Sequence, residues 1–99
     1  MAVTNMRTIA LEEHFATPDY ARGPGGHLAA AWGQDTLHVL CDLGAGRIAA
    51  MDAAGIDVQV LSLTSPGLEQ LSPSEAPDWA RSINDRVASA IAAHPTRLR

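Results

Sequence analysis

Apolar and polar positions along the chain predict two β-strands, one near the start and one in the middle. Residues 8–15 open with a short apolar run and end in the polar group Glu12-Glu13-His14. This pattern is typical of a buried strand whose C-terminal end lies in a polar environment. Residues 57–63 are rich in Val and Leu and precede the turn-forming residues 64–67. Each strand is therefore expected to end in a polar loop.

The same pattern predicts two helices. Over residues 43–54 an apolar residue recurs every third position, and Gly55 follows as a natural helix end. A second helix is expected over 75–94, where Pro95 stops it. Its buried face should consist of apolar residues at four-residue spacing, namely Trp79, Ile83, Val87 and Ile91.

Residues 16–41 show no clear period and contain Pro18 and the Gly23–Gly26 stretch, so we expect a long loop there. A loop of this length in a compact domain is usually functional or disordered. The predicted order is then strand, loop, helix, strand, helix. Strands that alternate with helices indicate an α/β protein with parallel βαβ units.

Composition narrows the function classes. The chain has 99 residues, 46% of them hydrophobic but only 4% aromatic, so a chain of this length is expected to be marginally stable alone. Its net charge of −4 and the lack of a basic run argue against nucleic acid as a partner. No apolar run is long enough for a membrane span. The first residues lack a signal-peptide core, so a cytoplasmic location is expected.

Candidate chemistry lies at the end of the first strand. Because side chains alternate along a strand, Glu12 and His14 should share a face while Glu13 points away. A carboxylate and an imidazole can together bind a divalent cation, although a zinc site needs three or four ligands. The alternative is an ordinary solvated strand end with no ligand.

Two segments carry a family resemblance. Residues 9–15, Ile-Ala-Leu-Glu-Glu-His-Phe, and residues 46–63 resemble the amidohydrolase-related family, in particular its γ-resorcylate decarboxylase-like branch. Residues 84–86 and 94–97 are similar to the family's second helix and its exit. The resemblance implies that residues 1–99 are the N-terminal βαβα portion of an incomplete (β/α)8 TIM barrel.

The resemblance also implies a metal centre. Glu12 and His14 match the Glu-x-His ligand pair of that branch, and the metal is expected to be zinc, with manganese as the alternative. The remaining ligands and the catalytic acid are expected beyond Arg99. The chain alone should therefore be inactive, whereas the full-length protein is expected to be a homo-oligomeric enzyme.

The implied reaction is non-oxidative decarboxylation of a small aromatic or unsaturated carboxylic acid. The alternatives are a metal-dependent hydrolase of the same superfamily, and a non-catalytic α/β interaction module or inactive remnant. Tyr20, Trp32 and Ser65 are candidate substrate-binding residues. For Tyr20 and Trp32 the alternative is packing within the loop, and for Ser65 it is turn formation.

Overall fold

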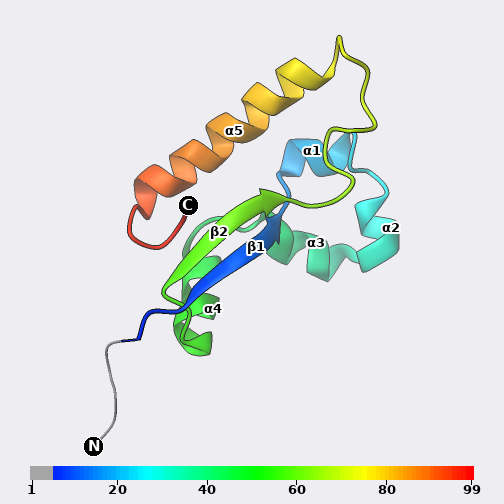
Figure 1. Cartoon of the computed structure of the whole chain (residues 1–99). Coiled ribbons are helices and arrows are strands. Elements are labelled where there is room, and N and C mark those ends of the chain that lie inside the picture. Colours follow the sequence, from blue (N-terminus) through cyan, green and yellow to red (C-terminus); the bar gives the residue numbers. More distant parts are fainter. Residues whose placement is uncertain (1–5) are drawn as a thin grey trace, which may run out of the picture.

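The computed structural model describes residues 6–99, which contain a two-stranded sheet and five helices (Figure 1). None of the helices within this range is both long and apolar enough to cross a membrane. In chain order the elements are β1 (Ile9–Phe15), α1 (Pro18–Arg22), α2 (Leu28–Trp32), α3 (Gln34–Cys41), α4 (Ala45–Ala54), β2 (Val58–Leu63) and α5 (Ala76–Ala93).

The two strands are parallel neighbours, so their carboxyl ends meet at one edge. His14 is aligned with Ser62 at that edge. On the other side of β2, Leu98 forms a single parallel bridge with Gln59. The last residues of the chain thus begin to add a third strand to the sheet, and Figure 1 places the C-terminus close to β2.

A β-bulge interrupts β1 between Ala10 and Glu13. Ala10 pairs with Gln59 and Glu13 pairs with Leu61. The two residues Leu11 and Glu12 therefore lie opposite the single residue Val60. Glu12 adopts the left-handed conformation with φ 57°. For a residue other than glycine this conformation costs about 1–2 kcal/mol. Bulges of this kind bend a strand and redirect its side chains.

The long segment 16–41 differs from the loop that the sequence predicts, because it contains the three short helices α1, α2 and α3. Pro18, Gly23 and Gly33 mark helix boundaries within it. The Thr17 hydroxyl accepts a hydrogen bond from the Tyr20 amide at 3.2 Å and caps α1, with Pro18 in the first turn. Gly33, with φ 85°, separates α2 from α3. The other predicted strands and helices lie within two residues of the observed bounds.

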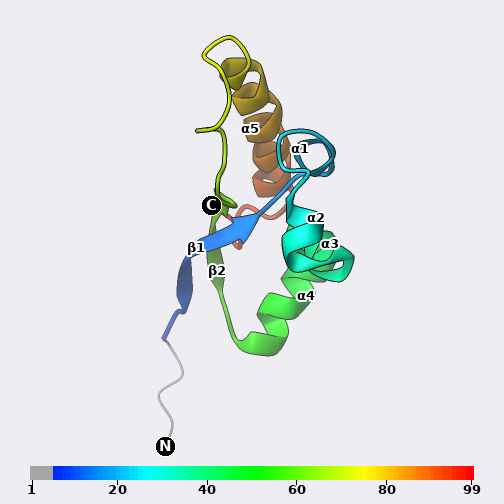
Figure 2. The same ribbon diagram turned by 90° about the vertical axis from the view of Figure 1, so that its right-hand side faces the viewer.

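The hydrophobic core lies between the sheet and the helices. Figure 2 shows α2, α3 and α4 on one side of the two strands. Ile83 is the most buried residue of α5, with Trp79 and Val87 partly buried beside it. The apolar side chains of Ile9 and Leu11 in β1, in contrast, are exposed. The core cluster consists of Phe15, Ala16, Tyr20, Leu28, Leu37, Leu43 and Ile83.

Candidate metal and substrate site

Both residues of the predicted ligand pair line one cavity at the carboxyl end of the sheet. Glu12 and His14 reach it from β1, and Ser62 and Leu63 from β2. Residues of the loop after β2 complete the lining, and the cavity, which is open to solvent, has a volume of about 400 Å³. In parallel α/β folds this end of the strands is where ligands bind. The full lining is Glu12, His14, Ser62, Leu63, Ser65, Pro66, Gly67, Leu68 and Glu69.

Glu13 is not among the residues that line this cavity. Its charge acts instead on Arg47 of α4. Burial lowers the pKa of the Arg47 guanidinium, and the carboxylates of Asp42 and Glu13 oppose that shift. The three consecutive polar residues of β1 are thus divided, with Glu12 and His14 at the cavity and Glu13 acting on the helix layer.

Residues 64–69 form the loop that borders the cavity, and hydrogen bonds hold its start and its middle. The Thr64 amide donates to the Phe15 carbonyl at 2.9 Å, which continues the pairing of the two strands. The Gly67 amide donates to the Thr64 carbonyl at 3.0 Å, and Gly67 has the left-handed φ of 65°. The Tyr20 hydroxyl donates to the Gly67 carbonyl at 2.9 Å. The loop therefore has a fixed position relative to α1.

The three predicted substrate-binding residues lie in different places. Ser65 lines the same cavity as Glu12 and His14. Tyr20 is fully buried in the core, where its ring contacts Trp79 edge-on, and burial raises the pKa of its hydroxyl. Trp32 lies 63% exposed at the end of α2 and does not line this cavity. The structure thus places Ser65 beside the ligand pair, and it places Tyr20 beneath the cavity loop.

The donor chemistry of the pair suits a divalent cation. A carboxylate oxygen and an imidazole nitrogen are common ligands of zinc and manganese. Both side chains are exposed, and no side-chain hydrogen bond within residues 6–99 involves the Glu12 carboxylate or the His14 imidazole. Among these residues no group of three or more His, Cys, Asp or Glu side chains could hold a metal. Glu12 and His14 are therefore two donor groups of the right kind, fewer than the three or four ligands of a zinc site.

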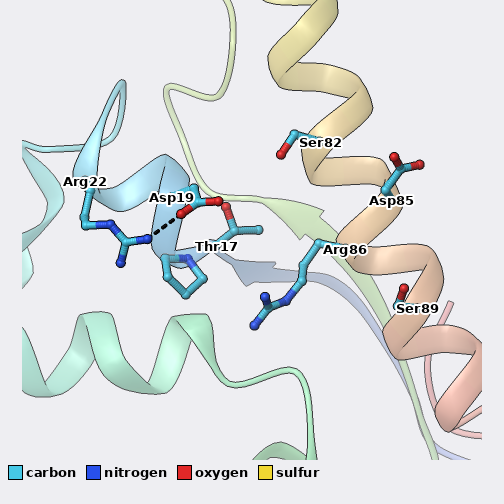
Figure 3. A pocket seen from close by; sticks show the side chains of 8 residues that line it. Thr17, Asp19, Arg22, Ser82, Asp85, Arg86 and Ser89 are labelled. Atoms are coloured by element: carbon cyan, nitrogen blue, oxygen red, sulfur yellow. Dashed lines mark hydrogen bonds and ion pairs between the residues drawn. The ribbon is translucent and has the colours of Figure 1, made fainter.

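A second cavity of about 390 Å³ lies between α1 and α5 (Figure 3). Arg22 and Asp19 of α1 form an ion pair there, and Figure 3 shows Arg86 extending from α5 into the same space. The charged residues around it are exposed and of both signs. We interpret this cavity as a solvated groove between two helices.

Sequence reasoning missed several residues that shape the site. Leu68 and Glu69 line the cavity, although the loop that carries them has no periodic pattern. Arg47 donates a hydrogen bond to the His14 carbonyl at 3.3 Å. The only sequence feature that could have pointed to Arg47 is that it is the one arginine of the predicted helix 43–54.

Comparisons with known proteins give a consistent result. No family model matches the chain. A γ-resorcylate decarboxylase from Rhizobium radiobacter is 34% identical over 91 residues, which are 91% of this chain and 28% of that protein. The chain thus spans little more than a quarter of the length of this curated relative.

Two solved structures share the fold. A 5-carboxyvanillate decarboxylase from Novosphingobium aromaticivorans, solved with manganese and 4-hydroxy-3-methoxy-5-nitrobenzoic acid, matches with a TM-score of 0.79 and 35% identity. A dihydroxybenzoic acid decarboxylase from Polaromonas sp. JS666, with bound manganese and 2-nitroresorcinol, matches with a TM-score of 0.80 and 34% identity. Each match covers 95% of this chain, and 32% and 29% of the respective structures.

These matches confirm that the chain is similar in sequence and fold to the γ-resorcylate decarboxylase-like branch of the amidohydrolase-related family. Its own fold is α/β with a small parallel sheet.

Proposed function

We propose that the intact protein containing this chain is a metal-dependent decarboxylase of a small aromatic carboxylic acid. The observation that carries this proposal is the joint presence of Glu12, His14 and Ser65 around one cavity at the carboxyl end of two parallel strands. The decarboxylases to which the chain is similar act on acids of this class, as their names state.

The architecture belongs to the same proposal. The chain supplies the first two βα units of a (β/α)8 barrel, and the bridge at Leu98 is the start of its third strand. A complete barrel of this type has about 250 residues. The exposed apolar side chains of Ile9 and Leu11 then face the barrel interior, where further strands cover them. The other metal ligands and the group that protonates the substrate carbon come from those further units.

Within the site, Glu12 and His14 hold the metal and the loop receives the substrate. A bound divalent cation supplies Lewis-acid polarisation of substrate oxygens. Leu63, Pro66 and Leu68 give the cavity an apolar wall against which an aromatic ring can pack. The Ser65 hydroxyl can donate a hydrogen bond to a carboxylate or phenolic oxygen. Two solved relatives contain manganese, so manganese is the first metal to test and zinc the second.

Metal analysis of three variants of the intact protein tests the proposal. Glu12→Gln keeps the shape of the side chain but removes its charge, and His14→Ala removes the nitrogen donor. Each should lose most of the bound metal and most of the decarboxylase activity, because a site with three or four ligands loses one of them. Glu13→Gln is the matched control and should retain its metal.

The result that contradicts the proposal is full metal occupancy in both the Glu12 and His14 variants. A wild-type protein that binds metal and hydrolyses an ester or amide, but releases no CO₂ from hydroxybenzoic acids, would support the hydrolase alternative. A wild-type protein without metal would support the non-catalytic module.

A further inference from the structure

Arg47 connects four separate parts of the fold through its guanidinium group. Its Nε donates to the Asp42 carbonyl at 2.7 Å, and its Nη1 donates to the Gln59 side-chain oxygen at 2.9 Å. Its Nη2 lies 3.3 Å from two carbonyl oxygens, those of Leu40 and His14. This side chain of α4 therefore joins its own helix to the end of α3, the middle of β2 and the carboxyl end of β1.

This network restrains the end of β1 that carries the two proposed ligands. The Leu40 carbonyl also accepts a hydrogen bond from the Ala16 amide at 3.1 Å. The backbone is thus held at His14 in β1 and again at Ala16 directly after it, and the Phe15 side chain between them is buried in the core. Glu12 lies two residues before His14 in the left-handed bulge. Strained backbone of this kind persists only when its surroundings fix it.

We propose that Arg47 is a positioning residue that fixes the His14 end of β1 and thereby sets the affinity of the site for its metal. The inference rests on the proposed function, because it assumes that Glu12 and His14 are ligands. Partners that orient metal ligands typically change metal affinity by about 10–100-fold when they are removed. A planar guanidinium with five donors can serve all four acceptors, whereas a lysine ammonium at the same position cannot.

The experiment compares Arg47→Lys with Arg97→Lys in the intact protein. Arg97 is a matched control because it also donates to backbone carbonyls, those of Ile56 and Asp57, and to the Asp52 carboxylate. Its contacts lie at the opposite end of β2 from the cavity. Both variants should lower the melting temperature. Titration with Mn²⁺, followed by electron paramagnetic resonance at a temperature where all proteins are folded, should show weaker binding only for Arg47→Lys, by about 10–100-fold.

Two results would overturn the positioning role. One is an Arg47→Lys affinity within about twofold of wild type, and the other is an equal loss of affinity in Arg97→Lys. If Arg47→Lys does not fold, Gln59→Leu decides the matter, because it removes one acceptor of Arg47 and leaves β1 intact. An affinity loss of about tenfold is then expected, and an unchanged affinity contradicts the inference. A wild-type protein that fails to bind Mn²⁺ overturns the proposed function itself.

Discussion

The helix-covered core and the first half of β1 differ sharply in how completely their apolar side chains are buried. On the helix side, Phe15, Tyr20 and Leu28 are at most 3% exposed. In the first half of β1, in contrast, Ile9 is 51% and Leu11 71% exposed, although both belong to the same strand as Phe15. Apolar residues on a strand are normally covered by a second layer. The apolar core of the described residues therefore lies on the helix side, and the proposed barrel predicts that further strands cover Ile9 and Leu11 in the intact protein.

The proposed chemistry follows the same division. The core residues fix where β1 and the cavity loop lie, whereas Glu12, His14 and Ser65 lie at the open end and carry exposed polar groups. Arg47 and Tyr20 connect the two regions, since each donates a hydrogen bond from the helix layer to backbone at the cavity. The helix layer therefore holds the cavity backbone at two points, the Gly67 and His14 carbonyls.

Leu28→Ala should show the largest effect on stability. Leu28 is 1% exposed, and truncation of such a residue leaves a cavity that costs about 2–5 kcal/mol. Val39→Ala on α3 is the control, because Val39 is 66% exposed and its truncation should cost under about 0.5 kcal/mol. Denaturant unfolding of the intact protein measures both. Equal effects would mean that the helix side is not the stable core.

Leu11→Asn tests whether the exposed first half of β1 is covered in the intact protein. If further barrel strands cover Leu11, the variant buries an unpartnered amide and should lose about 1–3 kcal/mol. Val39→Asn is the control for a site that stays exposed. A Leu11→Asn protein with wild-type stability would show that this face remains in solvent, and the barrel proposal would then be wrong.

Tyr20→Phe should have a smaller effect, of about 1 kcal/mol, because it removes only the hydrogen bond to the Gly67 carbonyl and keeps the ring in the core. Gln70→Ala is a useful comparison. The Gln70 side chain donates to the Pro24 carbonyl at 2.8 Å and joins the same two segments, but this bond is exposed. It should contribute less to the free energy of unfolding. A larger loss in Gln70→Ala would contradict the role given to Tyr20.

The periodic pattern of apolar residues predicted more of the structure than individual proline and glycine residues did. The strands and the two long helices follow from apolar periodicity, which reports which side chains are buried. The helices α1 and α2 have only five residues each, so no period can appear in them, and their proline and glycine boundaries were interpreted as loop signals. The bulge at Glu12 has no sequence signal, because a left-handed conformation is expected for glycine rather than glutamate.

The candidate site was predictable only where it depends on the alternation of side chains within one strand. The alternation of a strand predicts Glu12 and His14 at one cavity and Glu13 away from it, and the lining agrees, although β1 reaches this arrangement through a bulge at Glu12 that the sequence does not signal. Tyr20 was assigned to the substrate or to packing within its own loop, and its position depends on how α1 packs against residues 64–69, which a single sequence does not reveal. The same holds for Arg47, whose four acceptors lie on three different segments of the chain.

The most direct test of the central claim is a crystal structure of the intact protein grown with Mn²⁺, with anomalous diffraction recorded at the manganese absorption edge. The account predicts an anomalous peak within coordination distance of both the Glu12 carboxylate and the His14 imidazole, about 2.0–2.3 Å from each ligand atom, in the cavity bordered by Ser65. A manganese peak elsewhere, with the Glu12 and His14 side chains in contact only with solvent, would contradict it.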